Sequence, residues 1–216
     1  ISSINIPNSV TSIGTEAFRY CSSLTSIDIS NVTSIGDYAF GGCSSLTSIG
    51  DIPKVDSIGQ RAFQNCFSLE SITIPNVTSI GTYAFNACSS LSSITIPNVT
   101  SIGQSAFNGC SSLTSITIPN VTDIVSNAFT DCSNLTIVNI INVSSAISNA
   151  FNDAFSDVSY NITFSNALTS NALTSIDSTL LANFTYHRKE KISSINIPNS
   201  VTSIGTEAFR YCSSLT

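Results

Sequence analysis

The sequence repeats itself at a period of about 22 residues, and this period limits the fold more than any other feature. A unit of this length cannot enclose a core alone, so successive units must stack as the coils of a solenoid. A cysteine follows each of the first six phenylalanines of the repeat by three residues. The dipeptide Ala-Phe recurs in phase, with phenylalanines spaced 22, 23, 22, 22, 22 and 22 residues apart, at Phe18, Phe40, Phe63, Phe85, Phe107, Phe129 and Phe151.

The unit at 91–112, "LSSITIPNVTSIGQSAFNGCSS", shows what each coil predicts. The alternation in "SSITI" predicts a short strand with Ile94 and Ile96 on one face. Pro97 cannot donate to a strand ladder and ends it. A glycine then permits a turn, and "QSAFNGC" predicts one tight helical turn that packs Phe107 on the strand. The strands of stacked coils should pair as a parallel sheet, with Phe85 lying on Phe107 in the core.

The pattern L-x-x-I-x-I-P-x-x-V-x-x-I-G-x-x-A-F-x-x-C resembles the BspA-type leucine-rich repeat, over residues 1–155 and 192–216. The resemblance implies a β-rich leucine-rich-repeat solenoid, with a parallel sheet on one face and short helical turns and loops on the other. Members of that family are typically surface or secreted proteins, and several are adhesins. The resemblance therefore implies a non-enzymatic scaffold, extracellular or at the cell surface, that binds protein or glycan through the sheet.

The chain divides into three segments. Leucine-rich-repeat coils fill 1–155, and the pattern fails over 156–191, where "SYNITF" alternates like a strand. This irregular segment is either one or two degenerate coils that continue the stack, or an inserted hairpin or cap. The repeat restarts at 192–216, which is identical to 1–25.

The identical ends suggest a second function, that of a structural fibre. The offset between the copies is 192 − 1 = 191 residues, which is not a multiple of 22. We expect a parent protein with a super-repeat of 191 residues that continues past both ends of this chain, and copies that associate end to end. Reuse of one coil by design is the other explanation of the identity.

Composition narrows the partners. Charged residues make up 9% of the chain, against about 25% in ordinary globular proteins, and the surface must be rich in hydroxyls and amides. The net charge is −6, and the one basic cluster, "HRKEK" at 187–191, contains a glutamate. A nucleic acid is therefore not expected as a partner.

No apolar run approaches the ~20 residues of a membrane helix, so no membrane insertion is expected within this segment. The chain contains no Met, which indicates a processed chain or an internal piece.

Neither catalysis nor cofactor binding is expected. His187 is the sole histidine, and no serine has a visible base beside it. Zinc sites usually contain C-x₂₋₄-C pairs, and no such pair occurs. Cysteines of stacked coils would be spaced like strands, about 4.8 Å apart, with parallel side chains that suit disulfides poorly. We predict a column of buried free thiols.

The outward-facing residues of the strands are the candidate ligand-binding surface, because solenoids use such sheets for binding. A face that only confers solubility is the alternative, and a hydroxyl ladder that orders water or binds ice is a minor one. The candidate residues are Ser26, Asp28, Ser71, Thr73, Ser93, Thr95, Ser115, Thr117 and Asn139.

Eight asparagines begin N-x-S/T sequons and are candidate glycan acceptors in a secreted eukaryotic protein. Most lie in "NVT", where Asn and Thr also suit the turn that follows the strand. Glycans on successive coils would crowd one another, which favours the turn interpretation with few sites occupied. The sequons begin at Asn31, Asn76, Asn98, Asn120, Asn134, Asn142, Asn161 and Asn183.

Overall fold

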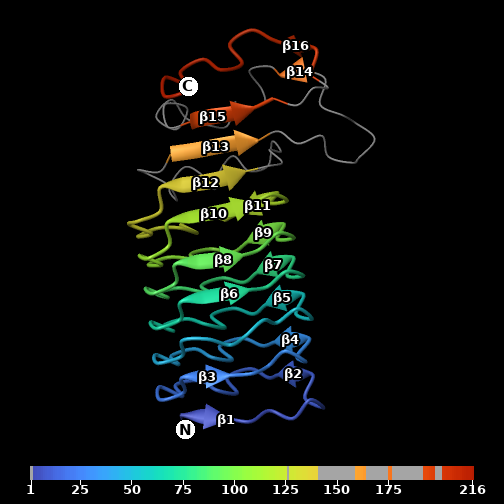
Figure 1. The fold of residues 1–216 in the computed structure, drawn as a ribbon, viewed down its shortest axis with the longest axis vertical. Coiled ribbons are helices and arrows are strands. Elements are labelled where there is room, and N and C mark those ends of the chain that lie inside the picture. Colours follow the sequence, from blue (N-terminus) through green and yellow to red (C-terminus); the bar gives the residue numbers. More distant parts are fainter. Residues whose placement is uncertain (1, 126, 141–158, 164–174, 177–191, 198–200) are drawn as a thin grey trace.

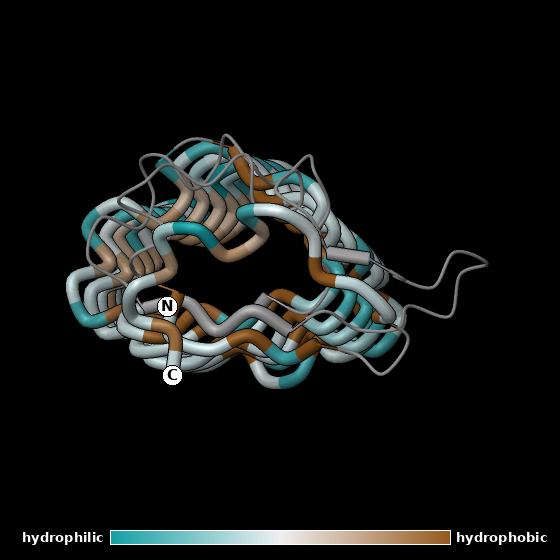
Figure 2. The backbone as a smooth tube through the Cα atoms, turned by 90° about the horizontal axis from the view of Figure 1, so that it is seen from above, coloured by the Kyte–Doolittle hydropathy of each residue, from teal (hydrophilic) through white to brown (hydrophobic). Residues whose placement is uncertain are grey.

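The coils stack along one axis with two columns of short strands, as the computed structural model shows (Figure 1). It describes residues 2–125, 127–140, 159–163, 175–176, 192–197 and 201–216. Seen along the stack, the coils superpose as an oval ring, and positions of like hydropathy lie over one another (Figure 2). This is the parallel solenoid that the repeat predicts.

The predicted strand of each coil forms the first column, and all of its pairings are parallel. The register joins equivalent residues of adjacent coils, as in Ser71 with Ser93 and Thr73 with Thr95. The coil with one extra residue bends out at Gly50 (φ 69°) and joins its neighbours only through isolated bridges. The strands are β1 (Ser3–Ile4), β3 (Ser26–Ile27), β6 (Ser71–Thr73), β8 (Ser93–Thr95), β10 (Ser115–Ile118), β12 (Ile137–Ile140), β13 (Ser159–Thr163) and β15 (Ile192–Asn196).

A second parallel sheet, which sequence reasoning missed, forms from the "S-I" or "D-I" before the glycine position of each coil. Its strands have two residues each, too short for any alternation to be recognised. Their isoleucines are buried, from Ile13 to Ile124. The strands are β2 (Ser12–Ile13), β4 (Ser34–Ile35), β5 (Ser57–Ile58), β7 (Ser79–Ile80), β9 (Ser101–Ile102) and β11 (Asp123–Ile124), and a separate pair joins β14 (Ser175–Ile176) to β16 (Ser203–Ile204).

One strand of the irregular segment joins the first column. The strand expected in "SYNITF" is present as β13, which pairs with β12 on one side and with β15 on the other. The register shifts between Tyr160 and Asn161. Residues 164–174 and 177–191 lie outside the described part, so the choice between degenerate coils and an insertion stays open there.

The short helical turns expected beside the phenylalanines are not helices, and no helix occurs in the described residues. The amides of Tyr83 and Phe85 donate to carbonyl oxygens of the next coil (2.9 and 2.7 Å), whereas those of Ala84 and Asn86 donate three residues back (3.2 and 3.1 Å). An α-helix needs every amide for its own chain. Tyr83 and Ala87 also have positive φ (57° and 60°), which a helix does not allow.

The core consists of columns of identical side chains. The rings of Phe85 and Phe107 stack with centroids 5.4 Å apart and planes 3° apart, which confirms the predicted contact. The column runs from Phe18 to Phe129 with spacings of 5.1 to 5.4 Å. Burial of each phenylalanine contributes about 1.5–3 kcal/mol, so the column is a major source of stability.

The glycine of each coil lies close to the backbone of the preceding coil. A Cβ atom on Gly103 would lie 2.7 Å from the backbone nitrogen of Thr82, nearer than real Cβ atoms come. The equivalent Gly14 has nothing within 4 Å of such an atom. Val125 occupies this position in the coil 113–134, and its amide still donates to the carbonyl oxygen of Ile102 at 2.8 Å, as that of Gly103 does to Ile80.

Candidate functional site

The structure brings the predicted ligand-binding residues to the outer face of the first sheet. Thr73 and Asn139 are half-buried, and the amide of Asn139 donates to the hydroxyl of Thr117 at 3.1 Å. The exposed members are Ser26, Asp28, Ser71, Ser93, Thr95, Ser115 and Thr117. Their placement agrees with the prediction, and their role in binding stays a prediction.

A depression of about 280 Å³ opens on this face between β8 and β10. It combines hydroxyl groups with apolar side chains, and it has no charged residue in its lining. Four of the nine predicted residues contribute to it, which makes it the candidate binding site. The lining residues are Ser93, Ile94, Thr95, Ile96, Pro97, Ser115, Thr117 and Pro119.

Many hydroxyls that the composition assigned to the solvent-facing surface also join one coil to the next. The Oγ1 atoms of Thr100 and Thr122 donate to the carbonyl oxygens of Thr78 and Thr100, at 3.1 and 3.2 Å. Thr33 and Thr47 make the same bond to the preceding coil, at 2.9 and 3.0 Å. The richness in threonine therefore serves the stacking as well as solubility.

The sequon asparagines hold the turns together. The side-chain amides of Asn76, Asn98 and Asn120 donate to the carbonyl oxygen of the proline one coil earlier, at 2.6, 2.7 and 2.8 Å. These bonds favour the turn interpretation, because Nδ2 is the atom that a glycan would occupy. Asn31 is half-buried and Asn134 is exposed. Asn142, Asn183 and the side chain of Asn161 lie outside the described part, and glycan attachment stays a prediction throughout.

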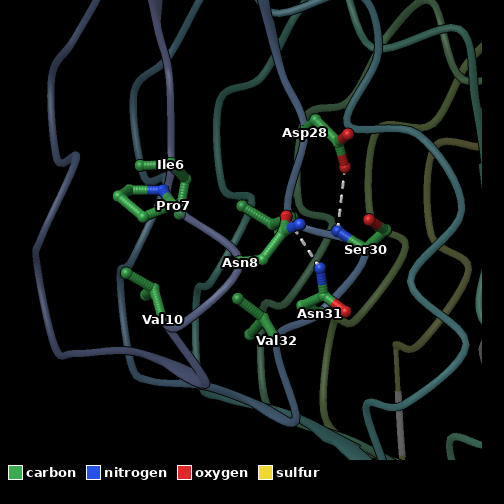
Figure 3. Close-up of a pocket in the computed structure, with 9 residues that line it drawn as sticks. Ile6, Pro7, Asn8, Val10, Asp28, Ser30, Asn31 and Val32 are labelled. Atoms are coloured by element: carbon green, nitrogen blue, oxygen red, sulfur yellow. Dashed lines mark hydrogen bonds between the residues drawn. The ribbon is translucent and has the colours of Figure 1, made fainter.

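The first two turns enclose a cavity of about 10 Å³ (Figure 3), which has room for one water molecule at most. Asn31 donates to the Oδ1 atom of Asn8 at 3.0 Å. The backbone amide of Ser30 donates to the carboxylate of Asp28 at 3.0 Å, and this bond lowers the pKa of Asp28. Asp28 thus shapes a turn here, and the cavity is too small for a ligand.

All seven cysteines are free thiols, and the five from Cys43 to Cys132 form the predicted buried column, whereas Cys21 and Cys212 are half-buried. Each thiol from Cys43 to Cys132 donates to a phenylalanine carbonyl of the preceding coil, at 3.0 to 3.2 Å. Burial raises the pKa of Cys43 to about 11 and that of Cys132 to about 12. Thiols that stay protonated at neutral pH are poor nucleophiles, so the column is structural.

A column of arginine and tyrosine side chains on the turn face was missed by sequence reasoning. The guanidinium carbon of Arg61 lies 5.3 Å from the ring centre of Tyr38 and 4.9 Å from that of Tyr83. Arg19 extends the column, 4.4 Å from the ring of Tyr38. The available signal was positional, since Tyr38, Arg61 and Tyr83 each directly precede an Ala-Phe pair.

Among the residues that the structure describes, no group of three or more His, Cys, Asp or Glu side chains is arranged to hold a metal ion. None of the described segments forms a helix that is long and apolar enough to cross a bilayer.

Two columns of parallel strands around stacked aliphatic and phenylalanine side chains define a leucine-rich-repeat solenoid. The chain belongs to the BspA type leucine rich repeat family, whose model matches residues 1–98, 56–183 and 179–216 in six copies. No curated protein matches the sequence.

Solved structures of similar fold include bacterial proteins. A leucine rich cell surface protein of Faecalibacterium prausnitzii is 32% identical over all of this chain, with a TM-score of 0.60, and the chain spans 60% of its length. The pneumococcal vaccine antigen PcpA is 19% identical over all of this chain and 71% of its own, with a TM-score of 0.53. A leucine rich repeat protein of T. pallidum is 21% identical over all of this chain and 78% of its own, with a TM-score of 0.47.

Proposed function

We propose that this chain is a non-enzymatic binding scaffold, extracellular or at the cell surface, that recognises a protein or glycan through the outer face of its first sheet. The observation that carries the proposal is the depression between β8 and β10, which lies among the hydroxyls of that face. Ligand sites are concave and combine apolar surface with a few polar groups. The cell-surface description of the Faecalibacterium protein, which is 32% identical, supports the location.

A binding role accounts for the chemistry of the site better than catalysis does. The side chains at the depression are hydroxyls, isoleucines and prolines, none of which is an acid or a base at neutral pH. The thiols that could act as nucleophiles are buried behind the sheet, and burial raises their pKa. The face therefore offers hydrogen bonds and contact area to a ligand.

The test is a panel of purified extracellular proteins and immobilised glycans, probed with the chain and two kinds of variant. Thr95→Arg and Thr117→Arg place bulk and charge at the depression, whereas Gln104→Arg does so on the exposed turn side. We expect the first two to weaken ligand binding at least tenfold and the third to leave it unchanged. Equal effects of all three variants, or a panel with no ligand, would contradict the proposal.

A structural fibre is the second candidate, and one strand pairing favours it. The strand β15 of the second copy pairs with β13 in the first column, so the restart of the repeat continues the same stack. A head-to-tail contact between successive copies is heterologous and can propagate.

The fibre is tested by sedimentation and electron microscopy of the purified chain. End-to-end assembly should increase with concentration, and Ile204→Lys should reduce it at least tenfold. Thr95→Arg, on the sheet face, is the control that should assemble normally. A chain that stays monomeric at high concentration would exclude the fibre and leave the binding scaffold unaffected.

The ice-binding alternative is weakened by the sheet itself. Ice recognition requires hydroxyls at a regular spacing, and the Ser-x-Thr row runs through β6, β8 and β10. The pairing of the row stops after β8, and Ile137 then replaces serine on β12. We do not propose this function.

A further inference from the structure

The first sheet is interrupted between β8 and β10. β8 pairs with β6, and β10 pairs with β12, but no pairing joins β8 to β10 (Figure 1). Residues 69–125, which include both strands, are all described by the structure. Each of the two strands therefore has one edge without a strand partner, and these two edges face each other.

Hydrogen bonds that recur elsewhere in the stack are missing at this junction. The amide of Ser92 donates to the carbonyl oxygen of Glu70, and that of Thr136 to Thr114, both at 3.0 Å. The hydroxyls of Ser92 and Thr136 reinforce the same carbonyl oxygens at 3.2 and 3.3 Å. Within the described residues, Thr114 makes neither bond to Ser92, the equivalent residue one coil earlier.

The exposure of the inward-facing isoleucines shows the same opening. Ile72 and Ile116 are 3% and 2% exposed, whereas Ile94 between them is half-buried and lines the depression. Backbone pairing, side-chain burial and the volume of about 280 Å³ thus place one fissure between β8 and β10.

The opening is confined to one face of the solenoid. At the same junction β9 still pairs with β11, and the rings of Phe107 and Phe129 stack at 5.1 Å. The coil 113–134 differs from the coils before it by having Val125 at the glycine position. At that position the amide of Val125 donates to the carbonyl oxygen of Ile102 at 2.8 Å, the same distance as from Gly103 to Ile80, so the two coils stay closely stacked on that side.

We infer that this fissure binds an extended, uncharged peptide segment that lies on the outer side of β8 and β10 and bonds to the backbone groups that these two strands leave unpaired. This inference rests on the proposed function, because it specifies the ligand class for the same surface. Unpaired strand edges are templates for another strand, and strand addition draws its affinity from main-chain hydrogen bonds. The lining contains neither a charged side chain nor an aromatic ring, so backbone groups and hydroxyls are the polar partners on offer.

The dimensions and lining specify the segment further. β8 contributes three residues, Ser93–Thr95, so a segment of about three residues matches its length at ~3.3 Å per residue. Side chains of a strand alternate between faces. An inward side chain of the bound segment would contact Ile94, and an outward one would lie beside the hydroxyls of Thr95 and Thr117. The site should therefore prefer alternating small apolar and polar residues.

The test uses a capped peptide, acetyl-Thr-Ile-Thr-Ile-amide, titrated into the isotopically labelled chain and followed by nuclear magnetic resonance. We expect shifts concentrated on the amides of 93–96 and 114–118. The same peptide with N-methylated backbone amides should bind at least tenfold more weakly, because it cannot donate to a strand edge. Absence of shifts at millimolar peptide, or equal binding of the methylated peptide, would overturn the inference.

Two variants locate the site. Ile94→Phe should fill the depression and weaken peptide binding at least tenfold, and Gln104→Ala, on the exposed turn side, should not change it. Unchanged binding to a folded Ile94→Phe chain would overturn the placement of the segment against Ile94. If the peptide does not bind but another ligand does, and Thr95→Arg weakens that ligand, the peptide inference is wrong and the proposed function stands. If neither the peptide nor any other ligand binds, the peptide inference and the proposed function are both wrong.

Discussion

The thiol of Cys88 donates a hydrogen bond to the carbonyl oxygen of Phe63, 3.1 Å away in the preceding coil. The same oxygen also accepts the backbone amide of Cys66 at 3.2 Å. A carbonyl oxygen has two lone pairs, and here one serves its own coil while the other serves the next. The cysteine column is therefore a set of donors between coils as well as a set of small apolar side chains.

Burial of the thiols predicts slow labelling. Cys66, Cys88 and Cys110 have no exposed surface, so a thiol reagent should reach them only when the chain opens. Mass spectrometry should show these three unmodified in the native chain and modified in denaturant. Cys21 and Cys212, which are half-buried, serve as the accessible controls. Rapid modification of Cys88 in the native chain would show that the column is open.

The raised thiol pKa values predict a loss of stability at alkaline pH. An unfolded thiol ionises near pH 9, whereas the pKa of Cys43 is about 11 in the folded chain. Stability is complete below pH 9. Between pH 9 and 11 the unfolded state releases protons that the folded state keeps, so the free energy of unfolding should fall by up to about 1.4 kcal/mol per pH unit for each buried thiol.

Denaturant melts between pH 8 and 11 measure this slope. Cys88→Ala removes one buried thiol, whose pKa burial raises well above its usual value. Its slope should be shallower than that of the parent chain by about 1.4 kcal/mol per pH unit. A free energy of unfolding that does not change over this range would show that the thiols do not gain protons on folding.

The phenylalanine column predicts a large cost for truncation in its middle. Phe107 stacks on Phe85 and Phe129 and has no exposed surface. Phe107→Ala should lower the free energy of unfolding by about 3–5 kcal/mol. Phe67→Ala is the matched control, because Phe67 is 46% exposed and lies outside the column; it should cost far less. A loss below about 1 kcal/mol for Phe107→Ala would contradict its burial.

The glycine column predicts opposite outcomes for one substitution at two equivalent places. Gly103→Ala sets a Cβ atom 2.7 Å from the backbone of Thr82, and such overpacking should cost about 1–3 kcal/mol. Gly14→Ala meets no atom within 4 Å and should be neutral or slightly stabilising, because alanine has less freedom than glycine when unfolded. Thermal melts of the two variants compare them directly, and equal losses would show that coil contact is not the reason for glycine.

The structural features that could be predicted from the sequence are those that arise when the same side chain recurs at the same position of every coil. Equal spacing of phenylalanines implied their stacking, and the alternation in "SITI" implied the first sheet. The second sheet was missed because a strand of two residues, such as Ser101–Ile102, has no period to read. The turn face was misread as helical because its hydrogen bonds join residues about 20 positions apart, as from Phe85 to Ala106.

The fissure could not be read from the strands that border it, because β8 and β10 share the letters "SIT". The coil 113–134 does differ from its neighbours at Val125, which stands in the glycine position, but the second sheet still pairs beside it. A glycine position becomes informative only when the neighbouring backbone is seen 2.7 Å from its missing Cβ atom. The hydroxyls of the candidate site were therefore predictable, but the concavity among them was not.

The alternation of amide partners on the turn face also bears on how such a gene can change in length. Tyr83 and Phe85 depend on the next coil, and Ala84 and Asn86 depend on their own, so every coil presents its neighbours with the same donors and acceptors. Recombination that adds or deletes one whole coil leaves each remaining amide with an equivalent partner. Adding or deleting half a coil would place the strand isoleucines of one coil beside the turn of its neighbour, and it would leave a row of backbone amides without acceptors. One whole coil is thus the smallest unit by which the gene can lengthen or shorten without disrupting the stack.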